Sequence, residues 1–243
     1  WSLAMENVGK EAGAADMLNL CAFLAPEEIP FELLIKSNEI LPSTLSAIVT
    51  NKLAFNRVLK TLRRYSLIES DDKTLSIHRL VQAVVRDRLK DHRKDWAGIA
   101  VNLLSASFRF KKENLKTWNE SAQLLPHVLA AASHAEELEA ASEATQHVLN
   151  EAGLYSSNRA NFMGAKAQLG RALILAEKVY GPDHPEVAAV VNNLGLVLQD
   201  LGELQEARKL YERALKIDEK VYGPDHPRVA RDVNNLGLVL QDL

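Results

Sequence analysis

The stretch Glu177–Leu201 reads EKVYGPDHPEVAAVVNNLGLVLQDL, and the stretch Glu219–Leu243 reads EKVYGPDHPRVARDVNNLGLVLQDL. The two stretches are identical at 22 of their 25 positions. We call the offset from Glu177 to Glu219 the repeat period. An identity of this length arises by duplication, and a fixed period in this range predicts a repeat architecture in which each unit packs against its neighbours.

Each copy predicts two helices. Gly181 and Pro182 end one helix, because Gly terminates helices readily and Pro cannot continue them. Asp183 then offers an N-cap, and Pro185 suits a first helical turn. Apolar residues at three- and four-residue spacing form the stripe of the next helix: Val187, Val191, Leu194, Leu198 and Leu201. After Gly202, a second helix directs another set inward: Leu204, Ala207, Leu210, Tyr211, Ala214 and Leu215.

These residues carry a family resemblance. The spacing of the tetratricopeptide signature is matched by Leu194-Gly195, Gly202, Ala207, Tyr211 and Ala214. The length of the repeat period, the Asn192-Asn193 pair and the YGPDHP connector are similar to the kinesin-light-chain subtype, although Val191 stands where the older signature often has Trp. In this family, Gly195 and Ala207 are small because the two helices of a unit cross closely there.

A weaker earlier copy extends the array. Gly153 lies one repeat period before Gly195, and Ala165 lies one repeat period before Ala207. We therefore expect an α-solenoid of tetratricopeptide repeats over residues 136–243, with a truncated last repeat, preceded by bridging helices over residues 93–135. The chain begins with Trp1 and stops within a repeat, so we expect it to be a piece of a longer protein.

The differences between the two copies predict a ligand-binding face. They are Glu186/Arg228, Ala189/Arg231 and Val190/Asp232, at positions i, i+3 and i+4 of the first helix, which share one helical face. The resemblance implies that this helix lines a groove, and Asn amides can pair with a peptide backbone. A protein or peptide ligand is therefore predicted to contact this set: Glu186, Ala189, Asn192, Asn193, Arg228, Arg231, Asn234 and Asn235. The alternative is a solvated face that varies freely.

The N-terminal pattern is different. Helices are expected at 15–25, 31–35, 41–49, 53–65 and 79–89. Between the last two, β-prone runs at 66–69 and 74–77 flank the turn Ser70-Asp71-Asp72-Lys73, which predicts a hairpin. Helices followed by a small hairpin are the order of a winged helix, which we assign to residues 1–92. The predicted fold is thus mainly α-helical.

This module resembles the winged-helix (ARC2-like) part of NB-ARC and related STAND ATPases, the class of plant resistance proteins and apoptotic protease-activating factors. The resemblance is carried by Cys21-Ala22-Phe23-Leu24-Ala25-Pro26, Ile29-Pro30, Tyr65-Ser66-Leu67-Ile68 and Ile77-His78-Arg79-Leu80-Val81-Gln82. It implies that His78 matches the histidine of the family's Met-His-Asp motif, which contacts the β-phosphate of ADP. Arg79 stands where that motif often has Asp, which puts a carboxylate-dependent contact in doubt.

The resemblance also implies partners. No G-x-x-x-x-G-K-[ST] loop occurs in the sequence, so the chain itself is not expected to be an enzyme or to hold a cofactor. An NTPase domain of the same protein would bind ADP or ATP. A ligand on the repeats would favour an open state, after which ADP leaves and protomers assemble into a homo-oligomer.

Composition restricts the other functions. The net charge is −3, and no apolar run approaches the length of a membrane span, so we expect a cytoplasmic protein. Metal binding is not expected, because His184 and His226 lie on successive repeats, and His127 and His134 are seven positions apart. Residues 51–94 hold twelve Lys or Arg against five Asp or Glu, so DNA binding by the winged helix stays open as an alternative. A plain protein–protein scaffold without a switch is the other alternative.

Overall fold

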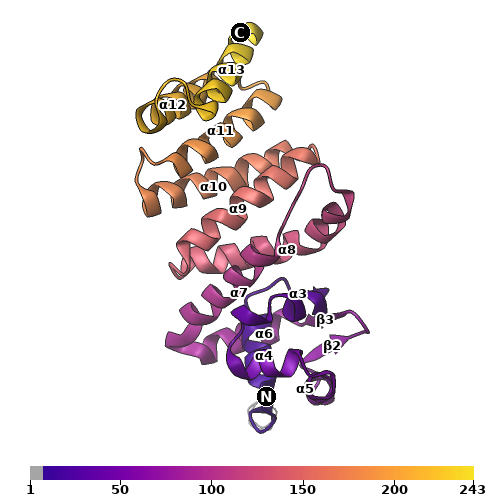
Figure 1. The fold of residues 1–243 in the computed structure, drawn as a ribbon. Coiled ribbons are helices and arrows are strands. Elements are labelled where there is room, and N and C mark those ends of the chain that lie inside the picture. The colour runs from indigo at the N-terminus through magenta and orange to yellow at the C-terminus, as the bar shows by residue number, and fades with distance from the viewer. Residues whose placement is uncertain (1–7) are drawn as a thin grey trace. The chain divides into compact units, whose positions relative to one another are not determined.

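The computed structural model describes residues 8–243; residues 1–7, where the expected winged-helix domain begins, lie outside the described part. The chain forms two compact units. The first comprises the described residues up to 109 together with 115–144, and the second comprises 110–114 and 145–243 (Figure 1). Residues 93–135, expected to bridge two domains, fall mostly in the first unit.

The first unit is mainly helical, with one small sheet. Its elements are α2 (Ala14–Cys21), β1 (Ile29–Pro30), α3 (Phe31–Lys36), η1 (Asn38–Ile40), α4 (Ser43–Val49), α5 (Lys52–Arg64), β2 (Ile68–Ser70), β3 (Thr74–Ile77), α6 (Arg79–Leu89), η2 (Lys90–His92), α7 (Arg93–Ser107) and α8 (Leu115–Glu137). Strands β2 and β3 form the predicted hairpin, with Ile68 opposite Ile77 and Ser70 opposite Leu75.

The hairpin turn is built by one side chain. Asp71 Oδ1 accepts hydrogen bonds from the backbone N–H groups of Lys73 and Thr74, each at 2.7 Å. These bonds, the Lys73 bond first, lower the pKa of Asp71. The sheet has a third strand that the sequence did not predict, because β1 pairs antiparallel with β3 and gives the order β1-β3-β2.

Helix α6 connects the hairpin to the core of the first unit. The buried Gln82 donates hydrogen bonds to the carbonyl oxygens of Cys21 and Leu24, at 2.8 and 2.9 Å, and Arg86 donates to that of Ala22. These bonds satisfy carbonyls at the end of α2, which stops at Cys21 rather than continuing to Ala25 as expected.

The second unit is a series of antiparallel helices. They are α9 (Ser142–Asn158), α10 (Phe162–Tyr180), α11 (Pro185–Asp200), α12 (Leu204–Tyr222) and α13 (Pro227–Asp242). Helices α9, α11 and α13 are the first helices of successive repeats, and α10 and α12 are the second helices (Figure 1). The mainly α-helical fold with an α-solenoid is therefore confirmed.

Close helix crossings recur with the repeat period. A Cβ atom built on Gly195 would lie 2.7 Å from Cε1 of Tyr211, and one built on Gly153 would lie 2.5 Å from Cγ of Leu169. Gly195 follows Gly153, and Tyr211 follows Leu169, by one repeat period. A side chain larger than hydrogen would therefore force the paired helices apart at both crossings.

The YGPDHP connector ends α10 and begins α11 through contacts among its own residues. Gly181 takes φ 86° at the end of α10, a conformation open to glycine, and Pro185 lies in the first turn of α11. The N-cap is His184 rather than the expected Asp183, because His184 Nδ1 accepts from the backbone N–H of Glu186 at 3.2 Å. The His184 ring also stacks on Tyr180, with ring centroids 4.9 Å apart. Asp183 instead accepts from Lys220 at 3.0 Å.

Candidate ligand-binding face of the repeats

The first helices of the repeats touch one another through asparagine side chains. Asn193 Nδ2 on α11 donates to Asn150 Oδ1 on α9 at 3.0 Å, and Asn235 Nδ2 on α13 donates to Asn192 Oδ1 on α11 at 2.9 Å. Both bonds join residues with the same separation in sequence, so the same rung recurs in successive repeats. Helices α9, α11 and α13 thereby form a continuous surface, which we call the first-helix wall.

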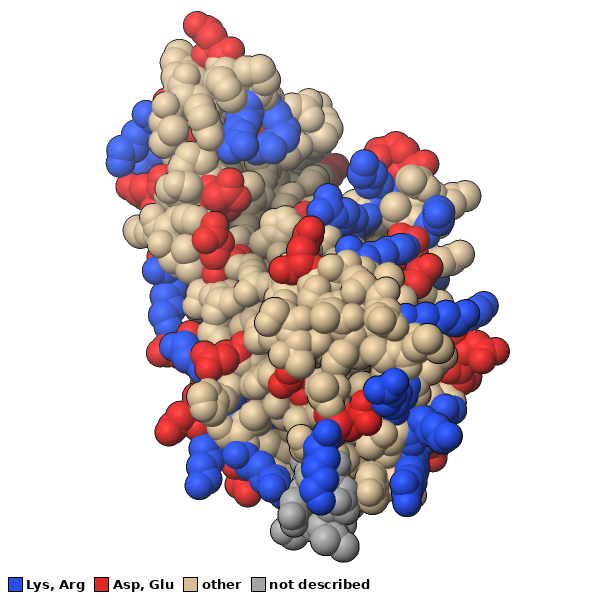
Figure 2. All heavy atoms as spheres, turned by 60° about the horizontal axis from the view of Figure 1, so that its bottom comes forward, with Lys and Arg blue, Asp and Glu red and all other residues tan. Residues whose placement is uncertain are grey.

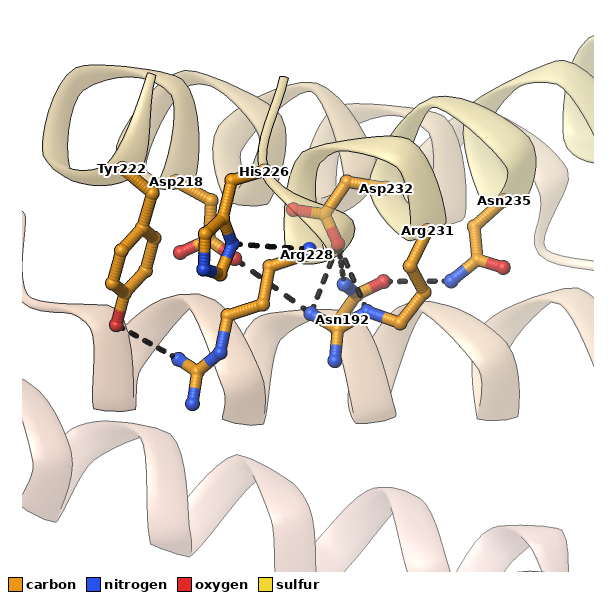
Figure 3. Close-up of polar contacts among 8 residues, drawn as sticks. All are labelled: Asn192, Asp218, Tyr222, His226, Arg228, Arg231, Asp232 and Asn235. Atoms are coloured by element: carbon orange, nitrogen blue, oxygen red, sulfur yellow. Dashed lines mark hydrogen bonds and ion pairs between the residues drawn. The ribbon is translucent and has the colours of Figure 1, made fainter. Parts of the chain in front are cut away.

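Asn192, predicted to contact a ligand, is buried between α11 and α13. Its side chain is only 2% exposed, and its amide donates to Asp232 Oδ1 while its carbonyl oxygen accepts from Asn235. Both functions of this amide are thus used inside the array (Figure 3). The contact with α13 therefore accounts for the burial of Asn192, and a ligand contact of this residue stays a prediction.

The other predicted groove residues lie at different depths. Glu186 and Asn234 are exposed, Ala189 is half-buried, and the half-buried Asn193 and Asn235 keep part of their surface open beside the rungs described above. Whether a ligand contacts these residues stays a prediction.

The two arginines of α13 are held by neighbouring groups. Arg228 donates to the hydroxyl oxygen of Tyr222 at 3.2 Å, with its guanidinium 5.2 Å from the ring centroid (Figure 3). Arg231 donates to Asp232 Oδ1 through Nε and Nη2, at 3.2 and 3.0 Å. Arg231 keeps 47% of its side chain exposed, so it combines a fixed position with access to solvent.

Gln199 adds one further bond between first helices and one bond to the second helix α12. Gln199 Nε2 on α11 donates to Asp242 Oδ2 on α13 at 2.8 Å, and its Oε1 accepts from the Tyr211 hydroxyl at 3.3 Å. Burial is the largest cause of the raised pKa of Tyr211, so this phenol stays neutral. The sequence analysis missed Gln199, although its recurrence at Gln241 was visible in the duplicated stretch.

In the first unit, His78 is the N-cap of α6. Its Nδ1 accepts from the backbone N–H of Leu80 at 3.1 Å, the same role that His184 and His226 play in the repeats. Because Nδ1 is the acceptor, the neutral ring carries its proton on Nε2. The side chain is exposed, which leaves that N–H in contact with solvent.

His78 also lines a small pocket. The pocket has a volume of about 290 Å³ and is lined by Pro26, Glu27, Ser66, Leu67, Ile68, Glu69, Ser76, Ile77, His78 and Arg79. Three of the four segments that carry the STAND resemblance contribute to this lining. A hydrogen bond of 2.7 Å from the backbone N–H of Ile77 to the carbonyl oxygen of Pro26 holds two of these segments together.

Ten of the twelve Lys and Arg residues of 51–94 are exposed, and the other two, Arg86 and Arg93, are half-buried. Arg86 is bonded to the end of α2, and Arg93 pairs with Glu137 at 3.2 Å. On the face seen in Figure 2, Lys and Arg side chains are interspersed with Asp and Glu. DNA binding by this region stays an alternative.

Among residues 8–243, no group of three or more His, Cys, Asp or Glu side chains is placed to hold a metal ion. None of the helices in this part of the chain is long and apolar enough to cross a membrane.

Comparison with known proteins identifies the repeats. Residues 186–243 and residues 145–186 each match a family model described as tetratricopeptide repeat. Residues 3–94 match a domain of unknown function (DUF7779). No curated protein matches the chain.

A solved structure is similar in outline. The crystal structure of BtubC (BKLC) from P. vanneervenii aligns with a TM-score of 0.48 and 17% sequence identity, over 87% of this chain and 83% of that one. The family matches place tetratricopeptide repeats over residues 145–243, and such repeats typically form scaffolds for protein–protein interaction.

Proposed function

We propose that the first-helix wall binds an extended protein or peptide segment. The observation that carries this proposal is the pair of asparagine rungs, which join α9, α11 and α13 into one surface. That surface offers the exposed Glu186 and Asn234 and the fixed but solvent-accessible Arg231. An extended segment crossing several helices would meet polar and charged groups whose positions are already set, which lowers the entropy lost on binding.

Peptides selected from a random display library against the whole chain would test this proposal. The double variant Glu186→Ala/Asn234→Ala changes two exposed wall residues and spares the buried contacts. We expect it to weaken binding of the selected peptides by about tenfold or more, in line with the loss of one or two polar interface contacts. Lys209→Ala on α12, whose side chain is 72% exposed, is the matched control and should bind normally.

The opposite pattern would reject the wall as the binding surface. Selected peptides that lose affinity with Lys209→Ala and keep it with the wall variant would place the ligand on the second helices.

We further propose that this binding regulates a nucleotide switch, with the chain acting as the regulatory and sensor portion of a STAND-type (NLR-like) signalling ATPase. Support comes from the pocket beside His78, where segments with the STAND resemblance converge. The Nε2–H of His78 is oriented by the Leu80 bond, so it can donate to a phosphate oxygen of ADP held by an NTPase domain of the same protein. Ligand binding would favour the state in which this bond is broken, and protomers would then assemble.

A pair of substitutions in a protein that carries the NTPase domain separates this role from helix capping. Asn also caps helices, so His78→Asn should preserve α6, whereas His78→Ala should weaken it. Both variants should release ADP faster, because both lack the imidazole donor. If His78→Asn retains ADP as the wild type does, His78 is only a cap.

A further inference from the structure

Two carboxyl groups are buried together where α13 packs on α12. Asp218 of α12 and Asp232 of α13 are both 0% exposed (Figure 3). Neither carboxyl oxygen of Asp218, nor Oδ2 of Asp232, has a hydrogen-bond donor among the groups of residues 8–243. A buried ionised carboxylate without donors is strongly unfavourable, so this arrangement calls for a neutralising proton.

The donors around the pair all serve one oxygen. Oδ1 of Asp232 accepts from Arg231 and from the Asn192 amide, whereas Asp218 lies 3.7 Å from the Arg231 guanidinium. These donors give Asp232 the hydrogen bonds that a charged carboxylate requires. An O–H on Asp218 would donate to the neighbouring carboxylate and so supply the hydrogen-bond donor that the pair otherwise lacks.

The charged and titratable groups around Asp218 come from few elements. Helix α13 contributes Asp232, Arg228 and Arg231, and α11 contributes only the uncharged amide of Asn192. On α12 itself the neighbour is Tyr222, which stacks on His226 of the connector, with ring centroids 4.4 Å apart. His226 is therefore the histidine whose contribution the experiment has to separate from that of the two aspartates.

The preceding repeat places apolar residues at the same positions. Ala176 stands one repeat period before Asp218, and Val190 stands one repeat period before Asp232. Both are buried. The same backbone arrangement is therefore formed in the preceding repeat with two apolar residues at these positions, so it does not require the aspartates.

We propose that Asp218 and Asp232 share one proton, and that this proton fastens α13 to α12, so that the contact between these two helices loosens when the proton is lost. Burial, followed by the negative charge of Asp232, raises the pKa of Asp218. A raised folded-state pKa gives stability that is fully present below the pKa of an unfolded Asp. That stability is lost as pH rises through the folded-state pKa.

Hydrogen exchange of the whole chain tests this proposal. Exchange of α13 amides is measured at about pH 5 and about pH 8, corrected for the intrinsic pH dependence of exchange, to bracket the ionisation of a buried acid. We expect protection of α13 to fall at the higher pH, by about tenfold for each unit by which the folded-state pKa of Asp218 exceeds the starting pH of about 5. Amides of α11, whose contact with α10 has Ala176 and Val190 at these positions, serve as the internal reference.

Three variants separate the pair from its surroundings. Asp218→Ala/Asp232→Val copies the preceding repeat and should remove the pH response of α13. Asp218→Asn imitates the protonated acid and should protect α13 at the higher pH as well as the wild type does at the lower pH. His226→Asn keeps a capping side chain, and its α13 should respond like that of the wild type.

Several results would overturn the proposal. They are equal protection of wild-type α13 at both pH values, a pH response that survives in the double variant, and a response that disappears with His226→Asn. If the double variant does not fold, Asp218→Asn decides: loss of α13 protection in that variant at about pH 8 would contradict the shared proton.

Discussion

Two junctions of the repeat array use the same backbone and different chemistry. Between α10 and α11, the positions at the contact hold Ala176 and Val190, both buried. Between α12 and α13, the equivalent positions hold Asp218 and Asp232, together with Arg231 in place of Ala189. The helices retain their lengths, with 19 residues in α10 and α12 and 16 residues in α11 and α13.

The comparison shows that shape and polarity are set by different residues. The YGPDHP connector fixes how the helices meet at both junctions, because it is identical in the two copies. The polar residues Asp218, Asp232 and Arg231 change only the chemistry of the contact between α12 and α13. They depend on one another, because one carboxylate alone would be buried without a partner. A carboxylate buried on its own should therefore be far more harmful than the pair of aspartates or the pair of apolar residues.

The largest effect is expected when a single acid is introduced into the apolar junction between α10 and α11. Val190→Asp places a single carboxylate beside Ala176, with no second acid and no arginine at the position of Ala189. We expect a loss of roughly 3–5 kcal/mol in the free energy of unfolding of the repeats, as for other unpaired buried charges. Urea denaturation followed by circular dichroism measures it. Val190→Ala, which only shortens the side chain, should cost less, and an equal loss in the two variants would contradict the account.

A second prediction contrasts the pH responses of the two units. Burial lowers the pKa of His127 in α8 to about 4, and its Nε2–H donates to the Glu28 carbonyl oxygen at 3.3 Å. The unfolded histidine binds its proton near 6.5, so the first unit should lose stability as pH falls from 6.5 towards about 4. The loss amounts to about 3 kcal/mol, the opposite direction to that expected for Asp218.

Urea unfolding followed by the fluorescence of Trp96 and Trp118, both in the first unit, measures this response. The variant His127→Gln cannot titrate and should flatten the dependence between pH 6.5 and about 4. An unchanged slope in that variant would assign the response to other groups.

A third prediction concerns the shared glycine crossings. Gly195→Ala puts a methyl group against the buried Tyr211 ring, and we expect it to cost about 1–3 kcal/mol, as overpacked positions do. A Cβ on Gly237, the equivalent glycine of the next repeat, would meet nothing within 4 Å in the described chain. Gly237→Ala is thus the matched control and should be neutral or slightly stabilising, because Ala favours helices. Thermal unfolding distinguishes the two; equal effects would mean that the crossing is not tight.

The smallest effect is expected in the connector. His184→Ala removes the N-cap of α11 and the stack on Tyr180, and we expect a loss of about 1 kcal/mol. His184→Asn keeps a capping side chain and should recover most of that loss, which calorimetry of the two variants can resolve. Full loss in His184→Asn would show that the stack, and not the cap, stabilises the connector.

The sequence predicted much of this fold, because duplication and turn chemistry leave local signals. The repeated glycines indicated the close helix crossings, and the Asp-rich turn predicted the hairpin. Strand β1 could not be predicted, since it has two residues, one of them proline, and exists only through pairing with β3. The early end of α2 depends on Gln82, which is distant in sequence.

Only part of the candidate site could be predicted from the sequence. The substitutions on α13 were interpreted as variation for a ligand, whereas Asp232 is buried and contacts Asn192 within the array. A signal for the pair was present, because Asp218 replaces Ala176 immediately before the duplicated stretch. Comparing equivalent positions of the two repeats across that boundary would have linked the two aspartates. The burial of Asn192 results from its contact with α13, and no feature of the sequence near Asn192 indicates it.

Hydrogen exchange of the whole chain with and without a library-selected peptide tests the central claim, that ligand recognition lies on the first-helix wall. The account predicts that the peptide slows exchange in α11 and α13 and leaves most of α12 unchanged. Slower exchange confined to α12, or to the first unit, would contradict it.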